Sequence, residues 1–131
     1  MKQALMVLGV AGLVLATSGT ARAQGGSPTD GRNLFRMYCA TCHGLDGKGG
    51  GPTAASLKKA PADLTVLQAK GQAFPGERVT HAIDGTGEAG PHGNREMPVW
   101  GQAFRYTKGT PPAELSVNRL VDYVKTIQVN K

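Results

Sequence analysis

Apolar residues recur every three or four positions near the C-terminal end of the chain, which is the spacing of one face of a helix. Ser116 stands just before the first of them and is a good N-cap residue. The pattern predicts an amphipathic helix of about three turns that starts after Ser116 and buries one face. The apolar positions of this segment are Val117, Leu120, Val121, Val124 and Ile127.

A second helix is predicted from residue 28 onward. Ser27 provides an N-cap, Pro28 suits the first helical position, and Asp30 places an acid in the first turn. Three apolar residues then follow with helical spacing and would form one apolar face. They are Leu34, Phe35 and Tyr38.

The middle of the chain alternates short elements with Gly- and Pro-rich loops. Residues 75–77 open a short helix that turns Val79, Ala82 and Ile83 inward, and Gly85 is a suitable C-cap. Residues 44–52 and 85–97 are rich in Gly and Pro and are expected to be loops. No segment shows the period of two that a strand requires. The chain is therefore expected to be a small all-α domain.

The first 23 residues have the pattern of an export signal. Lys2 precedes an apolar run over 4–16, and Ala21-Arg22-Ala23 is an A-x-A cleavage site. The run is shorter than the roughly 17–25 residues that span a bilayer. We expect cleavage before Gln24, which leaves a single domain over 24–131 without a membrane insertion. The mature protein is expected in a bacterial periplasm.

Composition narrows the classes of protein further. The chain of 131 residues holds 19 Gly and 8 Pro but only 1 Trp, 3 Tyr and 3 Phe. This length excludes a Rossmann or barrel enzyme and a multi-domain protein, and a cofactor would help so small a core. The formal net charge of +6 comes from scattered basic residues, without the clustered stripe of a nucleic-acid-binding protein.

The chemistry is expected at Cys39-Ala40-Thr41-Cys42-His43, a C-x-x-C-H motif typical of covalent attachment of one c-type haem. Two thiols at this spacing can add to the two vinyl groups of one porphyrin. The adjacent His43 would then be the proximal axial ligand, with its Nδ1–H held by a backbone carbonyl. These are the only two cysteines in the chain.

Three other uses of the motif are possible from the sequence. A thioredoxin-like dithiol would need a strand and helix around the motif, and none is visible. A zinc site would need a second Cys/His pair to complete four ligands. An isolated short-loop disulfide is the third alternative. The export signal and the adjacent His43 favour haem over all three.

Three residues are candidates for the second axial ligand. Met97 is favoured, because it stands in a loop before Pro98 where the chain can cross the open haem face. A thioether there favours the ferrous state and raises the reduction potential relative to a second histidine. His92 is the rival, whereas His81 is expected on a helix surface or in packing. Met37, just before the motif, is expected to pack.

Residues 27–129 resemble a mono-haem class I cytochrome c. The segments that carry the resemblance are Gly31 to Phe35 ahead of Cys39–Gly44, then Asp46–Pro52, Pro61–Thr65, Ile83–Gly85, Met97–Trp100, and Leu120 with Tyr123. The resemblance implies a fold in which the first and last helices cross at near right angles beside one haem. A small residue at the Gly31 position allows the close approach.

The same resemblance implies roles for residues around the haem. A proline carbonyl accepts from the proximal histidine in this family, and both Pro61 and Pro52 qualify here. Pro61 is favoured, because Leu64 follows it to pack against the haem ring. Trp100 corresponds to the aromatic residue at the haem edge, where it would help bury a propionate or simply pack against the ring.

The expected function is outer-sphere electron transfer rather than catalysis. With both His43 and Met97 on the iron, no position is open to a substrate, and the chain would act as a soluble carrier or as the haem subunit of a periplasmic oxidoreductase. Expected partners are a terminal oxidase, quinol–cytochrome c reductase or a periplasmic dehydrogenase. The alternative is a haem enzyme or gas-binding sensor with an open sixth position, for which His92 is the nearby acid/base group. A thiol–disulfide protein is a third, weaker hypothesis.

Overall fold

The computed structural model describes residues 28–86 and 97–129, which fold into helices joined by long loops. The α-helices are α1 (Pro28–Leu34), α2 (Ala40–His43), α3 (Gly76–Asp84), α4 (Trp100–Tyr106) and α5 (Ala113–Thr126). A π-helical turn, η1 (Phe35–Cys39), joins α1 to α2. Two 3-10 turns, η2 (Ala54–Ser56) and η3 (Leu64–Val66), lie in the long loop before α3. No strand occurs among the described residues, and the all-α prediction is confirmed.

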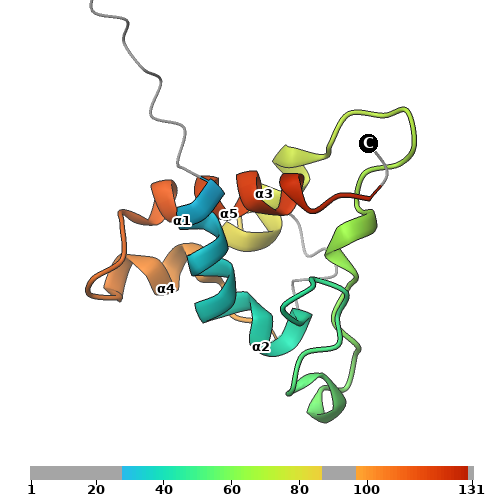
Figure 1. Cartoon of the computed structure of the whole chain (residues 1–131). Helices are drawn as coiled ribbons and strands as arrows, with labels where there is room; N and C mark the ends of the chain where they lie inside the picture. Colours follow the sequence, from blue (N-terminus) through green and yellow to red (C-terminus); the bar gives the residue numbers. More distant parts are fainter. Residues whose placement is uncertain (1–27, 87–96, 130–131) are drawn as a thin grey trace, which may run out of the picture.

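In Figure 1, α1 (blue) passes across α5 (red), and α3 and α4 pack against α5 and against each other. The loop between α2 and α3 runs along one side of the helices. The buried apolar core joins α1, η1, α2, α3, α4 and α5. Its members are Leu34, Phe35, Ala40, Val79, Ile83, Phe104, Val117, Leu120 and Val124.

The crossing of α1 and α5 depends on a glycine. Gly31 is buried, and a Cβ built there would overlap the backbone carbonyl of Arg119 and lie 2.9 Å from Tyr123 Cβ. Around this point Phe35 is fully buried, and its ring lies 5.1 Å from that of Tyr123. Leu120 is fully buried as well. The predicted close approach of the first and last helices is confirmed.

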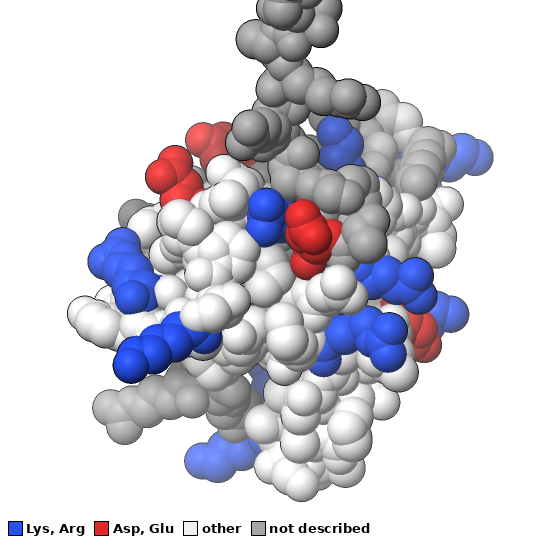
Figure 2. Space-filling view, turned by 60° about the vertical axis from the view of Figure 1, so that its left-hand side comes forward, with Lys and Arg blue, Asp and Glu red and all other residues white. Residues whose placement is uncertain are grey.

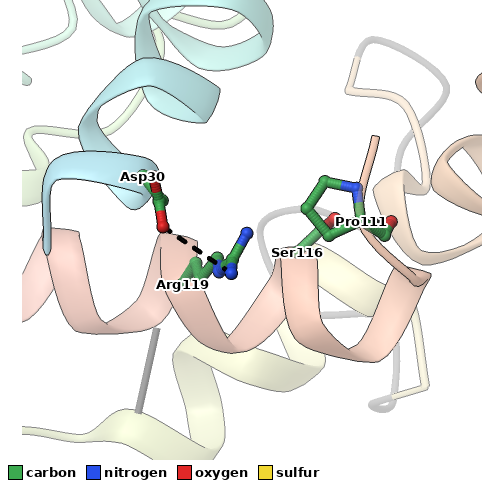
Figure 3. A network of polar contacts seen from close by, with 4 residues as sticks. All are labelled: Asp30, Pro111, Ser116 and Arg119. Carbon is green, nitrogen blue, oxygen red and sulfur yellow. Dashed lines mark hydrogen bonds and ion pairs between the residues drawn. The ribbon is translucent and has the colours of Figure 1, made fainter. Parts of the chain in front are cut away.

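One ion pair joins α1 to α5, and one hydrogen bond lies at the start of α5 itself (Figure 3). Arg119 Nη2 of α5 lies 3.6 Å from Asp30 Oδ2 of α1. Because both side chains are partly exposed, the ion pair adds little stability compared with the apolar contacts beside it. Ser116 Oγ donates a hydrogen bond to the Pro111 carbonyl at 3.0 Å.

This second contact corrects the predicted start of α5. Ser116 was expected to cap the helix, but the helix begins at Ala113, with Pro112 at the N-cap position and Ser116 fully buried in the first turn. Its hydroxyl bonds backward to Pro111 instead of forward to a free N–H. The two prolines suit this helix start, because Pro112 itself has an extended backbone with a φ of -47° and a ψ of 145°.

Other expectations for the elements are confirmed, and two elements were not foreseen. The helix that starts at Pro28, the inward Val79 and Ile83, and the C-cap at Gly85 are confirmed. The signal peptide and Ser27 lie outside the described residues. The sequence patterns predicted neither α4 nor the π turn. Met37 is 61% exposed, so the expectation that it packs is wrong for this structure.

Substitution of Gly31 tests the helix crossing. Gly31→Ala should lower the free energy of unfolding by about 1–3 kcal/mol, because the added methyl meets the backbone of α5 and the helices must separate. Gly76→Ala is the matched control, since its methyl would meet nothing closer than 3.6 Å. Denaturant unfolding of both variants measures the difference, and equal stabilities would contradict the crossing.

Candidate haem-binding site

The C-x-x-C-H motif lies where the first helical run ends. Cys39 is the last residue of the π turn, and Cys42 and His43 belong to α2. The N–H of Ala40 reaches back to the Phe35 carbonyl, which is the five-residue spacing of a π turn. Such turns often mark functional sites in helices. The motif is thus continuous with α1, the helix that α5 holds in place.

The imidazole of His43 is buried and bonds to the backbone. Its Nδ1 lies 3.0 Å from the carbonyl oxygen of Ala62. Burial lowers the pKa of His43, and the hydrogen bond to Ala62 opposes this effect without cancelling it. The imidazole is therefore neutral at physiological pH. With Nδ1–H donating to Ala62, Nε2 is left with its lone pair, which is the state that an axial ligand needs.

The carbonyl that accepts from His43 was expected to be that of Pro61, and this expectation is wrong. The acceptor is Ala62, one residue later. The Pro61 carbonyl faces Gly49 instead, where a Cβ would overlap its oxygen. Packing of Pro61 and Leu64 against a haem remains a prediction, and Leu64 is partly buried against the apolar core.

The two thiols of the motif are free and partly buried. Burial raises the pKa of Cys39 to about 12, and the nearby Cys42 adds to this effect. Cys39 is thus a neutral thiol at physiological pH. Cys42 Sγ lies 3.2 Å from the hydroxyl of Thr53, in the loop that follows the motif. No group of three or more His, Cys, Asp or Glu side chains within 28–86 and 97–129 is placed to bind a metal ion.

The glycine-rich loop after the motif closes the end of α2. The last four carbonyls of a helix lack partners within it. Here the N–H groups of Gly44, Gly49, Gly51 and Thr53 donate to the carbonyls of Ala40, His43, Cys42 and Thr41, at 2.9, 2.7, 2.9 and 3.1 Å. The hydroxyl of Thr53 adds a bond of 2.9 Å to Thr41. All four carbonyls are hydrogen-bonded, and the loop thereby fixes the position of the motif helix.

The backbone of this loop approaches α2 too closely for a side chain at one position. A Cβ at Gly51 would overlap the Thr41 carbonyl and lie 2.6 Å from the carbonyl carbon of Cys42. The neighbouring Gly50 has nothing within 4 Å of such a Cβ. The sequence showed only that residues 44–52 could wrap closely around something; the structure shows that they wrap around the end of the motif helix.

Trp100 and Met97 lie where α4 begins. Trp100 is the first residue of α4, and its ring lies 5.3 Å from Tyr38 and 5.7 Å from Phe104. Tyr38 precedes Cys39 in the chain, so this aromatic group brings α4 to the motif. Met97 is partly buried three residues before Trp100. Its predicted role as axial ligand remains a prediction.

The histidine rivals of Met97 differ in position. His81 is exposed on α3, and its Nδ1 lies 2.7 Å from Thr86 Oγ1, which agrees with the surface role expected for it. His92 lies outside the described residues. The residues brought together at the motif are therefore two free thiols and one neutral imidazole whose Nδ1 is already bonded. This donor set fits a haem c, with Cys39 and Cys42 forming the thioethers and His43 facing the iron.

Comparison with known proteins agrees with this fit. Residues 26–109, more than half of the chain, match the family described as "Cytochrome C oxidase, cbb3-type, subunit III". The chain belongs to this family of c-type cytochromes. No curated protein matches the chain.

One solved structure supports the fold of this c-type cytochrome. It is a chain of the reducing HAO-like protein complex of Kuenenia stuttgartiensis, with a TM-score of 0.51 and 21% sequence identity. The match covers 76% of the cytochrome and 41% of that chain, so the cytochrome spans well under half the length of its structural relative. At this identity the likeness concerns the fold alone.

Sequence analysis did not identify Ala62, Thr53 or Tyr38 as parts of the site. Ala62 acts through its backbone carbonyl, which leaves no trace in residue type, and the hydroxyl of Thr53 reaches the motif only because the loop folds back on α2. Tyr38 was expected only in a helix face. Its place between Trp100 and Phe104 depends on α4, which was not foreseen.

The loop behind the motif gives a test with adjacent glycines. Gly51→Ala should force the loop away from α2 and break the bond from residue 51 to the Cys42 carbonyl, and we expect a clear loss of haem-loaded protein. Gly50→Ala should accumulate like the unsubstituted protein, because its methyl meets open space. Haem content per polypeptide measures both, and equal loading would show that the loop contact is dispensable.

Proposed function

We propose that this chain carries single electrons on one haem c, with His43 and Met97 as axial ligands, in the periplasm. The observation that carries the proposal is the hydrogen bond from His43 Nδ1 to Ala62, which leaves Nε2 for the iron. When bound, haem c supplies an iron that takes up and releases one electron. Cys39 and Cys42 would hold it covalently.

The protein residues would set the potential and the access to the iron. The carbonyl of Ala62 makes the His43 imidazole more basic and fixes its orientation. The thioether of Met97 would occupy the remaining axial position and favour the ferrous state. With both positions filled by the protein, no substrate reaches the iron. Trp100 and Leu64 would add apolar surface around the ring.

The proposed location and partners rest on the N-terminal sequence, the helix lengths and the surface charge. The expected signal peptide over 1–23 would export the chain, and in the described part of the mature chain no helix is both long and apolar enough to cross a bilayer. On the face seen in Figure 2, Lys and Arg side chains lie at several separate places, some of them beside Asp or Glu, and do not form one continuous basic surface. Docking to a terminal oxidase, quinol–cytochrome c reductase or periplasmic dehydrogenase would then receive only weak electrostatic steering.

The visible spectrum tests this proposal directly. Protein from a periplasmic extract should show sharp low-spin ferrous bands, the weak far-red ferric band of sulfur ligation, and no response to carbon monoxide. High-spin bands, or a prompt shift on adding carbon monoxide, would instead show an open iron and favour a haem enzyme or gas-binding protein. A colourless protein with two titratable thiols would be a thiol–disulfide protein.

Substitution of Met97 tests the sixth ligand. Met97→Ala should lower the reduction potential, abolish the far-red ferric band and allow carbon monoxide to bind, because a soft ligand to ferrous iron is lost. His81→Ala is the control, since its ring is exposed and bonded to Thr86. If Met97→Ala keeps the original spectrum and His92→Ala loses it, the sixth ligand is His92.

A further inference from the structure

A buried amide lies just beyond the C-terminal end of α5. Gln128 is only 4% exposed, although it is a polar side chain near the end of the chain. Its Nε2 donates to the carbonyls of Leu64, at 2.6 Å, and of Val124, at 2.9 Å. Its Oε1 accepts from the N–H of Gln68 at 2.9 Å. Both amide hydrogens and the amide oxygen are therefore bonded.

These bonds fasten the loop segment 62–68 to α5. Val124 belongs to the helix itself, whereas Leu64 and Gln68 belong to the loop. A backbone bond of 2.9 Å from Val129 N–H to the Thr65 carbonyl lies between the two side-chain contacts. A shift of this segment would break the bonds to Gln128, since hydrogen bonds weaken steeply with distance and angle.

The fastened segment contains the carbonyl that orients His43. Ala62 precedes Leu64 by two residues, and the Leu64 N–H donates to the Gly47 carbonyl at 2.7 Å. Gly47 lies in the loop that closes α2. Two anchors therefore hold the chain two residues after the Ala62 carbonyl: the α2 loop bonds to the Leu64 N–H, and Gln128 bonds to the Leu64 carbonyl.

We infer that Gln128 is a positioning residue for the proximal ligand: it holds segment 62–68 so that the Ala62 carbonyl accepts from His43 Nδ1. This inference rests on the proposed function, in which His43 binds the haem iron. The hydrogen bonds of the Gln128 side chain go to Gln68, Leu64 and Val124 and not to His43, so Gln128 acts through the loop backbone.

An amide is the side chain that this position requires. Two carbonyls must receive hydrogen atoms and one N–H must find an acceptor, and a neutral amide supplies two donors and an acceptor at once. A glutamate of the same shape would keep the bond from Gln68 but would face the Leu64 and Val124 carbonyls with a carboxylate. A leucine of similar volume would leave all three backbone groups without this partner.

Loss of the Gln128 amide should change the reduction potential of the haem in a defined direction. When the segment shifts, the bond between His43 Nδ1–H and the Ala62 carbonyl lengthens, and the imidazole becomes a weaker electron donor. A weaker donor stabilises the ferric state less, so the reduction potential should rise. The Nδ1–H proton should also exchange faster with solvent, by about tenfold or more, because its protecting bond opens more often.

The experiment compares Gln128→Leu with Val117→Ala in the haem-loaded protein. Val117 is a buried apolar residue of α5, so its truncation destabilises the core without touching the Gln128 contacts. The midpoint potential and the exchange rate of the His43 Nδ1–H, measured by nuclear magnetic resonance in the ferrous state, are recorded for both, along with stability. Gln128→Leu should raise both quantities, and Val117→Ala should lower stability alone.

Each outcome decides the inference. An unchanged potential and exchange rate in Gln128→Leu, or equal changes in Val117→Ala, would overturn it. If Gln128→Leu does not accumulate with haem, Gln128→Glu decides by the same two measurements, since it keeps the shape and the bond from Gln68. Failure of the proposed function is separate, because the unsubstituted protein would then lack haem or a histidine-ligated low-spin spectrum.

Discussion

The contact of α1 with α5 at Gly31 sets the positions of the haem-binding motif and of the segment that orients His43. Backbone lies against side-chain and backbone atoms there, so the two helices have no room to slide or approach further. From that point α1 continues through the π turn into the haem-binding motif, and α5 runs to Thr126, two residues before Gln128. A chain with few large side chains thus fixes the two ends of its site by one tight crossing.

The motif itself depends on the backbone groups behind it. A short helix such as α2 ends with carbonyls that water or other groups must satisfy. The loop over 44–53 supplies four N–H groups to them, and it can do so because Gly51 carries no side chain. The glycines that make this loop look unstructured in the sequence are the reason that it can pack against α2. The orientation of His43 is then completed by a carbonyl from the next segment, at Ala62.

The sequence predicted those features that side-chain type determines. The apolar spacing identified the faces of α1 and α5, and Cys39, Cys42 and His43 identified the attachment motif for haem c. It could not identify features set by the backbone: the acceptor for His43 is Ala62 rather than Pro61, and residue type carries no signal for that choice. The predicted helix start at Ser116 was wrong because a capping preference is a local property, whereas the burial of Ser116 depends on the rest of the fold. The first turn of α5 follows from Pro112 instead.

Apolar contacts and hydrogen bonds have different roles in α5 and in the residues that follow it. Apolar contacts such as those of Leu120 supply most of the stability, but they are non-directional and tolerate small rotations of their neighbours. Hydrogen bonds are directional, and the amide of Gln128 fixes the orientation of the segment that contains Ala62. A methyl group lost from the core therefore weakens the fold without turning a carbonyl. Loss of the amide should turn the Ala62 carbonyl that His43 uses. Under the proposed function, the potential of the haem should then respond to Gln128, which does not contact the ligand itself.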